Sequence, residues 1–463
     1  MSEFPFSVTI KPTRSDDKPQ SIKCMGLLRS VRGKRRVYEA LWGDRPVILK
    51  VFSDPIKAKY HMNREWRGLT LLQQRGLNSP TPLFKGRCNR LGWAVVTEKI
   101  TDAVNVRQAL DNTIDGNDTR QLLRKVVREL ARQHSKGVLQ RDLHMANFMI
   151  KGDETFALDP SQMRFISGRV GPRRSIAQLA QLASFAPEED ENTISMVCEE
   201  YARVRSCKFS ESDMTLFSKE LTGWIKKAVN RGVRKSLRTS KRYQRFNRYG
   251  HRGVAIRKFL ENPDLGELAA NIDNAMNDGH VLKNGNTCFV SHIGLAGKEV
   301  VVKRYNHKGI IHSLRHTIKG SRARRSWLHA NRLTLLKVAT PKPLAYFERR
   351  KGTIVWKSYF VTEHVKGQRL CDFLRDDTKS RNERARRTEQ LREVLAKLHK
   401  YNITHGDLKL TNILVTDNGP VLTDLDAMKV HTFRWICRIK RRKDTARMKA
   451  NMEIDRHKDE NKG

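Results

Sequence analysis

Acidic residues are scarce in this sequence of 463 residues. Asp and Glu together number 49 against 91 Lys and Arg, which gives a formal net charge of +42. A soluble surface with a modest excess of lysine accounts for a few units of charge but not for this many. An imbalance of this size predicts anionic partners: nucleic acid, a negatively charged membrane face or phosphorylated substrates.

Cysteine pairs and long apolar runs are also missing. The seven cysteines are an odd number and none stands in a CxxC pair. This argues against a disulfide framework and a zinc site, and is typical of a reducing cytoplasm. No stretch approaches the roughly 20 apolar residues that span a bilayer, and residues 1–20 lack the apolar segment of a signal peptide. We therefore expect any contact with a membrane to be at its surface.

One polar motif occurs twice in the chain. In each copy an Asp is followed five residues later by an Asn, and twelve residues after that by a second Asp that ends a short apolar run. The two copies are Asp142, Asn147, Asp159 and Asp407, Asn412, Asp424. All three positions are offset by the same 265 residues. The pattern indicates a duplicated domain rather than a solenoid of short repeats.

The elements around the two motifs recur in the same order. In each half, apolar strands with turns precede a helix closed by prolines, then a short strand, a second helix and the motif. The expected helices cover residues 55–75 and 119–136 in the first half, and 322–337 and 384–400 in the second. The order predicts an α+β fold with two tandem bilobal domains.

The domain limits follow from changes in composition. Residues 1–235 are predicted to form the first domain, and residues 276–463 the second. The second has a shortened helical lobe, because fewer residues follow its motif. Residues 236–275 are rich in Arg and Lys and are predicted to form a weakly packed basic connector, with an ordinary solvated helix face as the alternative.

The motif residues suit phosphoryl transfer. That reaction needs a carboxylate beside the attacking hydroxyl, a cation on the phosphates and one or two Mg²⁺ ions held by oxygen ligands. Asp142 and Asp407 each follow a predicted helix, on a loop where a carboxylate can face a cleft. The oxygen ligands of the metal are predicted to come from the asparagines and the second aspartates: Asn147, Asp159, Asn412 and Asp424.

The segment His-Gly-Asp-Leu-Lys-x-x-Asn at residues 405–412 resembles the catalytic loop of the lipopolysaccharide-core kinases, which have the protein-kinase-like fold and phosphorylate heptose or Kdo sugars. It is also similar to that of aminoglycoside phosphotransferases. Three further features favour the lipopolysaccharide kinases: the Arg-x-Trp triplets at 64–66 and 325–327, the proline-containing segment 340–345, and the strand that ends at Glu363. The resemblance covers most of both halves.

The resemblance implies roles for the site residues, with ATP and Mg²⁺ as cofactors. The first aspartate of each motif corresponds to the catalytic base, and the other motif residues correspond to Mg²⁺ ligands. The lysines at strand ends correspond to the residue that holds the ATP phosphates, a helix glutamate to its partner, and two further glutamates end the hinge strands. These are Lys50 and Lys303, Glu65, and Glu98 and Glu363.

The sequence departs from the kinase pattern in several places. Neither half has a Gly-x-Gly-x-x-Gly loop, and neither second aspartate is followed by Phe-Gly. Ser326 stands where the second half should have the helix glutamate, and Gln140 replaces the usual His before Arg141 and Asp142. The first site therefore keeps the fuller set of polar partners, and the second keeps the better-formed catalytic loop.

The leading hypothesis is ATP-dependent phosphorylation of a heptose or Kdo sugar of the lipopolysaccharide core, by a peripheral protein at the cytoplasmic face of the inner membrane. Its expected partners are the core or a lipid-linked sugar acceptor, and the anionic membrane surface. A protein kinase acting on Ser, Thr or Tyr is an alternative, against which the lack of an Ala-Pro-Glu-like segment argues.

A second alternative is a kinase-like binding protein with one inactive site, which docks on an anionic membrane or on RNA. The missing helix glutamate of the second half and the basic stretch 236–275 favour it. No RNA-binding motif is present in the sequence, so we do not expect nucleic acid to be a partner. The sequence does not determine the oligomeric state.

Overall fold

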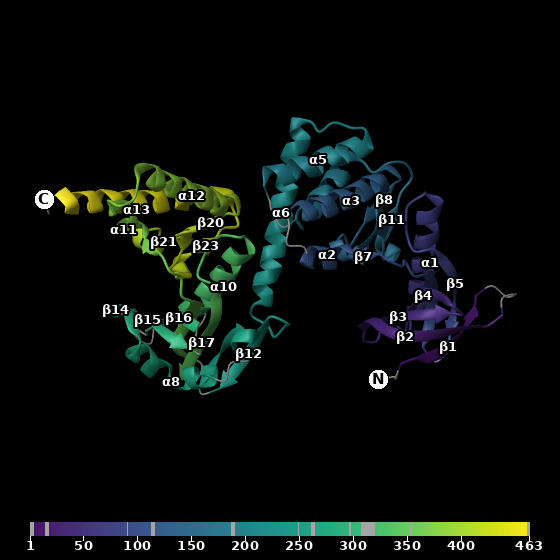
Figure 1. Ribbon diagram of the computed structural model, residues 1–463, viewed down its shortest axis with the longest axis horizontal. Coiled ribbons are helices and arrows are strands. Elements are labelled where there is room, and N and C mark those ends of the chain that lie inside the picture. The colour runs from purple at the N-terminus through teal and green to yellow at the C-terminus, as the bar shows by residue number, and fades with distance from the viewer. Residues whose placement is uncertain are drawn as a thin grey trace. The chain divides into compact units, whose positions relative to one another are not determined.

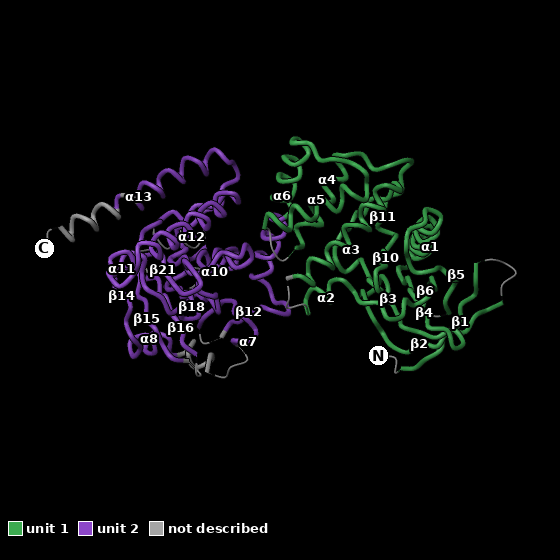
Figure 2. Tube along the Cα trace, turned by 45° about the horizontal axis from the view of Figure 1, so that its top comes forward, with its two compact units in different colours: residues 1–224 green, residues 225–463 purple. Residues whose placement is uncertain are grey.

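The protein is described by a computed structural model, which covers residues 4–13, 18–89, 91–112, 116–186, 190–248, 250–260, 264–295, 298–306, 320–351 and 354–460. The chain forms two compact units, Met1–Trp224 and Ile225–Gly463 (Figure 2). Each unit has a β-sheet lobe followed by a mainly helical lobe (Figure 1), which confirms the predicted α+β fold of two tandem bilobal domains. The change of unit falls within helix α6 (Glu211–Lys235), the helix that also contains the predicted end of the first domain.

The sheet lobe of the first unit is a closed barrel in the order β1-β2-β3-β4-β6-β5. Strands β1 to β6 are Phe6–Pro12, Gln20–Val31, Arg35–Trp42, Arg45–Phe52, Pro82–Cys88 and Gly92–Glu98. Alternate residues of β4, namely Val47, Leu49 and Val51, are buried in the barrel core. Successive side chains of a strand point to opposite faces, so Lys50 leaves β4 on the outer face.

Helix α1 (Ala58–Gln74) packs against the outer face of the barrel. Its buried residues include Met62 and Leu69, which form a small core with Phe52 of β4. The spacing of these residues matches one helix face. Glu65 lies on the same face and is only 4% exposed, so the helix directs a carboxylate at the strand that carries Lys50.

The helical lobe of the first unit contains α2 (Val106–Asn112), α3 (Gly116–Ser135), α4 (Pro172–Ala183), α5 (Glu191–Arg205) and the first part of α6. Its short strands are β7 (Val104–Asn105), β8 (Val138–Gln140), β9 (Phe148–Lys151), β10 (Glu154–Ala157) and β11 (Met163–Phe165). Strand β8 pairs with β11 and β9 pairs with β10, all antiparallel. The loops between them include the 3₁₀ turns η1 (Met145–Asn147) and η2 (Pro160–Gln162) and carry the first motif.

The sheet lobe of the second unit has seven strands in the order β12-β13-β17-β18-β16-β15-β14. In chain order, strands β12 to β18 are Tyr243–Arg248, His251–Ile256, His280–Gly285, Cys288–Leu295, Lys298–Tyr305, Pro343–Lys351 and Ile354–Glu363. Helices α7 (Arg257–Leu260) and α8 (Asp264–Asp278) precede β14. Ile272 and Met276 of α8 pack in a core with Phe347 and Tyr359 of the sheet.

Helix α10 (Arg322–Leu335) packs on the same sheet through other residues. Trp327 is fully buried and its ring lies 5.7 Å from that of Tyr346 on β17. Tyr346 and Phe347 are neighbours on one strand and point to opposite faces. Helices α8 and α10 therefore cover opposite faces of the sheet.

The stretch 236–275 is part of this lobe and differs from the predicted weakly packed connector. Strand β13 pairs antiparallel with both β12 and β17, so it lies inside the sheet. Its apolar residues Val254 and Ala255 are buried although the arginines around them dominate the composition. A basic composition does not reveal strand pairing made by the backbone. Residues 249 and 261–263 of the predicted connector lie outside the described residues.

The helical lobe of the second unit contains α11 (Leu370–Arg375), α12 (Arg381–Lys400) and α13 (Arg434–Glu460). Its short strands are β19 (Gln368–Arg369), β20 (Ile403–Thr404), β21 (Ile413–Thr416), β22 (Gly419–Leu422) and β23 (Lys429–Val430), with 3₁₀ turns η3 (Leu410–Asn412) and η4 (Leu425–Ala427). After the second motif, α13 takes the place that α4, α5 and α6 have after the first. Within the described residues, no helix is both long and apolar enough to cross a membrane.

Gly68 sets how closely α1 approaches the loop of the first motif. A Cβ atom at Gly68 would lie 2.8 Å from both Cβ and the carbonyl oxygen of Pro160, which directly follows Asp159. Real Cβ contacts are not this short, so the helix and the loop can meet only because position 68 has no side chain. This contact brings Glu65 and Asp159 to the same lysine.

We expect Gly68→Ala to destabilise the first unit by about 1–3 kcal/mol, the usual cost of overpacking a closely packed contact. Gly223→Ala is the matched control, since Gly223 also lies within a helix and its Cβ would meet nothing within 4 Å. Alanine there should stabilise by up to about 1 kcal/mol through helix propensity. Urea unfolding of the full chain measures both. Equal stability of Gly68→Ala and wild type would show that α1 can shift away from Pro160 freely.

Candidate active site

The two lobes of the first unit meet at a cluster of four charged side chains. Lys50 Nζ lies 2.7 Å from Glu65 Oε1 and 2.8 Å from Asp159 Oδ1. Arg35, on β3, donates to both carboxylate oxygens of Asp159 at 3.1–3.4 Å. The lysine comes from β4, the glutamate from α1 and the aspartate from the loop before η2. The cluster therefore joins sheet, helix and loop.

Two cations balance two anions in this partly buried cluster. Burial acts to raise the pKa of Asp159, but the charges of Lys50 and Arg35 outweigh it and hold that pKa well below its usual value. Burial acts to lower the pKa of Lys50, but Glu65 and Asp159 outweigh it and raise that pKa above its usual value. Both groups are charged at neutral pH. Removal of one partner would leave a charge without its counter-ion, which costs on the order of 3 kcal/mol.

Asn147 braces the loop that carries Asp142. Its Nδ2 donates to the carbonyl oxygen of Asp142 at 2.7 Å, and its own carbonyl accepts from the N–H of Leu158 at 2.8 Å. The side chain of Asp142 is 66% exposed and lies 3.6 Å from His144 Nε2. Asp159 has a left-handed backbone with φ of 56°, which turns the chain into η2. The loop therefore presents one open carboxylate next to a buried amide.

The second motif repeats these bonds with the corresponding atoms. Asn412 Nδ2 donates to the carbonyl oxygen of Asp407 at 2.9 Å, and the Asn412 carbonyl accepts from the N–H of Thr423 at 2.9 Å. Asp424 is again left-handed, with φ of 57°. Lys303 Nζ forms an ion pair with Asp424 Oδ1, as Lys50 does with Asp159. The two motifs thus share geometry as well as spacing.

The second unit differs at the helix glutamate. Ser326 of α10 is buried, and its hydroxyl lies 2.8 Å from the hydroxyl of Tyr305 at the end of β16. The carboxylate that lies near Lys303 in addition to Asp424 comes instead from Asp426 of η4. Arg322, in the first turn of α10, donates from Nε to Asp426 Oδ2 at 2.6 Å. Helix α10 is thus connected to the loop by an arginine–aspartate pair.

Asp424 and Asp426 form a tightly coupled pair of carboxyl groups. Burial raises the pKa of Asp426, and its hydrogen bond with Asp424 raises it further. Burial also acts to raise the pKa of Asp424, but Lys303 and the bond from Asp426 outweigh it and lower that pKa. Two neighbouring carboxyl groups avoid repulsion by sharing a proton. Asp424 is therefore the member of the pair that is ionised.

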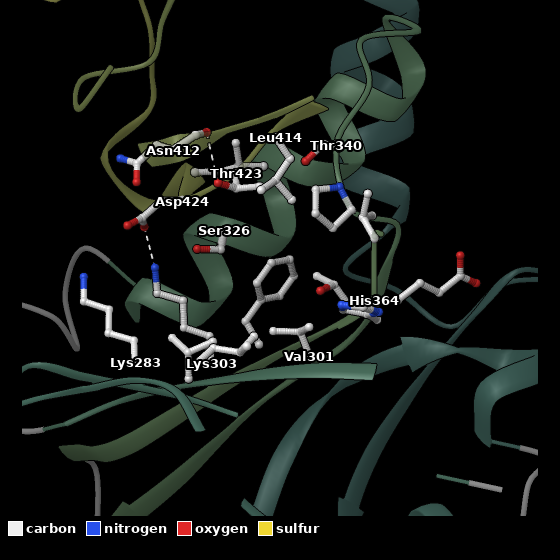
Figure 3. A pocket seen from close by; sticks show the side chains of 18 of the residues that line it. Lys283, Val301, Lys303, Ser326, Thr340, His364, Asn412, Leu414, Thr423 and Asp424 are labelled. Atoms are coloured by element: carbon white, nitrogen blue, oxygen red, sulfur yellow. Dashed lines mark hydrogen bonds and ion pairs between the residues drawn. The ribbon is translucent and has the colours of Figure 1, made fainter. Parts of the chain in front are cut away.

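A cavity of about 620 Å³ lies over this cluster in the second unit. Its walls include Lys303 and Ser326 on one side and Asn412 and Asp424 on the other, together with Glu363 at the end of β18. Figure 3 shows the Lys303 side chain directed at Asp424 from the sheet. Clefts of roughly 300–1,000 Å³ accommodate drug-sized ligands, so the cavity is large enough for a nucleotide.

Helix α13 contacts the loop of the second motif, at Gly406 and Asp407. Arg447 Nη1 donates to Asp407 Oδ1 at 3.1 Å and to the carbonyl oxygen of Gly406 at 2.8 Å. Both carboxylate oxygens of the buried Asp444 accept from the N–H of Gly406 at 3.1 Å. Lys409 Nζ lies 3.3 Å from the same oxygen of Asp407. Asp407 thus has two cationic neighbours.

The two hinge glutamates make local ion pairs. Glu98 pairs with Arg45 on the adjacent strand β4, and Glu363 Oε1 lies 2.9 Å from Lys342 Nζ. Glu363 also lines the cavity of the second unit. The structure therefore brings Glu363 to the cavity, whereas Glu98 belongs to an exposed ion pair at the end of β6.

The motif residues fit a magnesium ion that the protein holds together with the phosphates of a bound nucleotide. Asn147 and Asn412 donate through Nδ2, so their amide oxygens remain as acceptors beside Asp159 and Asp424. Hard oxygen donors suit Mg²⁺, which is usually held by one or two carboxylates together with substrate phosphates. Within the described part of the chain, no group of three or more His, Cys, Asp or Glu side chains could hold a metal by itself.

Three residues of the two clusters were not predicted from the sequence: Arg35, Arg322 and Asp426. The Asp-x-Asp spacing at 424–426 was an available signal for the last of them. Nothing in a chain with 91 basic residues distinguishes the two arginines from the others. Their positions depend on strand register and on the start of α10.

A lysine on a sheet lobe paired with a loop aspartate, next to an asparagine-braced Asp loop, is the arrangement of protein-kinase-like phosphotransferases. The model of the lipopolysaccharide kinase (Kdo/WaaP) family matches residues 52–166 and 278–461, more than half of the chain and parts of both units. The chain belongs to this family and is a kinase. The resemblance inferred from the motifs is thereby confirmed.

Solved structures also match the chain. One of them is the kinase domain of PknI from M.tuberculosis, which is 16% identical in sequence. The match covers 38% of this chain and 72% of that chain, with a TM-score of 0.26. No curated protein matches the chain significantly.

A buried chain of polar side chains lies behind the loop of the first motif. Gln140 Nε2 donates to Gln133 Oε1 at 2.9 Å, and Gln133 Nε2 donates to Glu129 Oε1 at 2.9 Å. Gln140, at the end of β8, thus links α3 to the residues that lead into Asp142, and it stands where the family pattern has His. Burial raises the pKa of Glu129 to about 7, although the bond from Gln133 opposes this.

The stability of the first unit should therefore depend on Glu129 between pH 4.5 and pH 7. The folded state holds this proton more tightly than the unfolded chain, so stability is lost as pH rises through the folded pKa of about 7. Glu129→Gln keeps the hydrogen bond and removes the titration. We expect the variant to be more stable than wild type above pH 7, by about 1.4 kcal/mol for each unit of pKa difference.

Urea unfolding of both proteins between pH 5 and pH 8 measures this effect. The nearby His134, whose pKa burial lowers to about 4, is present in both proteins and cancels in the comparison. Parallel stability curves for the variant and wild type across this range would contradict a raised pKa at Glu129.

Proposed function

We propose that the chain uses ATP and Mg²⁺ to phosphorylate a heptose or Kdo hydroxyl of the lipopolysaccharide core, as a peripheral protein at the cytoplasmic face of the inner membrane. The observation that carries this proposal is the repeated lysine–aspartate pair, Lys50–Asp159 and Lys303–Asp424, in a chain of the lipopolysaccharide kinase family. Both pairs stand beside the same asparagine-braced loop.

Each side chain has a definite task in this proposal. Lys50 and Lys303 bind the phosphates of ATP, and Glu65 orients the first of them. Asp142 and Asp407 orient the acceptor hydroxyl and accept its proton. Asn147, Asp159, Asn412 and Asp424 hold the metal, which neutralises phosphate charge when it is bound. Glu98 and Glu363 mark the strands that border the adenine.

The two sites have different roles in this proposal. The carboxylate of Asp142 is 66% exposed, whereas that of Asp407 is 30% exposed and is contacted by Arg447 of α13. An acceptor reaches the first aspartate directly, but at the second it must share the aspartate with an arginine. Either the two units phosphorylate different hydroxyls, or one of them transfers phosphate and the other positions the acceptor.

Asp142→Asn and Asp407→Asn test the chemistry. Loss of a general base reduces turnover by roughly 10²–10⁴-fold, so each variant should lose transfer of phosphate from ATP to a dephosphorylated core oligosaccharide at its own position. Asp153→Asn is the matched control, since the Asp153 side chain is 97% exposed and lies in the same lobe. Mass spectrometry of the product locates each phosphate.

Three results would contradict the proposal or a part of it. Absence of transfer by the wild-type protein, with unchanged core mass in strains that carry the variants, would exclude the sugar-kinase function. Identical loss of product in both single variants would exclude separate roles for the units. Transfer to a protein instead of the core would favour the protein kinase.

The membrane surface is proposed as a partner because of α13 and the residues before it. Phe433, Trp435 and Ile439 are all exposed, Trp435 to 64%. Exposed basic residues surround them, among them Arg434, Arg438, Lys440, Arg441 and Arg442. A basic helix with aromatic and aliphatic side chains can lie in the interface of an anionic bilayer. The same helix also carries Arg447, which contacts Asp407.

Sedimentation with vesicles of phosphatidylglycerol and phosphatidylethanolamine tests this surface. The full chain should bind, and its affinity should fall as salt rises because the attraction is electrostatic. Phe433→Ser with Trp435→Ser should weaken binding, while Ile56→Ser, at an apolar residue that is 89% exposed elsewhere, should not. Equal binding by all three proteins would exclude this face. Binding to RNA that competes with vesicles would favour the binding-protein alternative.

A further inference from the structure

A second, smaller pocket of about 260 Å³ lies in the sheet lobe of the second unit, outside the site described above. Four arginines line it: Arg245 of β12, Arg252 of β13, Arg324 of α10 and Arg350 of β17. We call it the arginine pocket. Nothing in the proposed transfer reaction uses these residues.

Strand register places these arginines on one face of the sheet. Arg245 pairs with Val254, which pairs with Tyr346, and Arg252 pairs with Glu348. Cross-strand partners point to the same face, as do alternate residues of one strand. Tyr346 contacts Trp327 of α10. The arginine pocket therefore lies on the face of the sheet that α10 covers.

The pocket has a large excess of positive charge. Of the residues that line it, all of which the structure describes, Glu348 is the one carboxylate. Its Oε2 already accepts from Arg350 Nη2 at 2.7 Å. One ion pair therefore leaves three further guanidinium groups around a small concave space. Like charges that line one small space repel one another, so the pocket is suited to an anion.

The start of α10 forms one wall of the pocket. Gly320 and Ser321 line it, and Ser321 caps the helix by accepting from the N–H of Arg324 at 3.1 Å. The amino end of a helix carries partial positive charge and favours anions. A phosphate group also matches the planar, forked donors of arginine better than most anions do.

The same helix turn reaches the active site on its other side. Arg322, between Ser321 and Arg324, donates to Asp426, which is bonded to Asp424. A ligand that fixes the first turn of α10 would also fix the position of Arg322. In the second unit this contact replaces the usual glutamate–lysine link between helix and site.

We infer that the arginine pocket binds a phosphate group. The bound group stabilises the contact that α10 makes, through Arg322, with Asp426 of η4. The phosphate belongs either to a phosphorylated sugar of the acceptor or to free phosphate or pyrophosphate. Both sources present the same chemistry to the pocket.

Calorimetric titration of the full chain with pyrophosphate, at constant ionic strength, tests the binding. The double variant Arg245→Gln, Arg252→Gln should bind pyrophosphate at least roughly tenfold more weakly, since each charged hydrogen bond contributes about 1.5–3 kcal/mol. Both arginines are exposed, so their loss should leave the fold intact, as thermal unfolding will show. Arg349→Gln is the matched control: it is exposed and lies on β17 between Glu348 and Arg350, on the opposite face.

Two further measurements identify the source of the phosphate and test the link from the arginine pocket through α10 to η4. Tighter binding of a phosphorylated core oligosaccharide than of pyrophosphate, lost on dephosphorylation, identifies the acceptor; equal binding identifies free phosphate. In hydrogen exchange, the ligand should protect the start of α10 and η4, and Arg322→Gln should abolish protection of η4 alone. Unchanged affinity in the double variant, or equal loss in Arg349→Gln, would overturn the inference. None of these measurements requires kinase activity, so they fail or succeed independently of the proposed function.

Discussion

The ion pair between a sheet lysine and a loop aspartate is the interaction on which both units depend. Lys50 leaves the barrel on its outer face because Leu49 and Val51 beside it point into the core. Lys303 leaves the sheet on the face opposite Val302, which packs in the core with α8. Asp159 and Asp424 reach these lysines from the opposite lobe of the same unit. The pair therefore fixes the lobes of each unit to one another, and it does so with the groups that would bind a nucleotide and its metal.

Both units place a second carboxyl group and a second cation near the lysine–aspartate pair, but they take these groups from different elements. In the first, the second carboxylate comes from the helix as Glu65, and Ser161 lies two residues after the loop aspartate. In the second, the serine is on the helix as Ser326, and the carboxylate is on the loop as Asp426. The extra cation moves as well, from Arg35 on a strand to Arg322 on the helix. The missing glutamate of the second half is thus replaced by a carboxyl group from the loop, which bonds Arg322 of the helix and Asp424 instead of pairing with the lysine.

The sequence predicted the duplicated plan well because it rests on local pattern. Helices α1, α3, α10 and α12 lie close to the predicted limits, and the matched motifs do have matched bonds. The predicted connector was wrong because strand pairing of β12 and β13 depends on backbone bonds to β17, far along the chain. The contacts of Arg322 with Asp426 and of Arg447 with Asp407 were equally beyond sequence reasoning, since only the fold brings such distant residues together.

The left-handed backbone of Asp159 and Asp424 restricts which residues these positions accept. A residue with a side chain pays roughly 1–2 kcal/mol for this conformation, and Asp and Asn are among those that adopt it most readily. Glutamate would keep the negative charge but not this conformational tolerance. Asparagine would keep the backbone and lose the charge. The backbone of this turn therefore favours a substitution that removes the carboxylate, whereas the ion pair with the lysine requires one, and among these residues aspartate is the one that meets both demands.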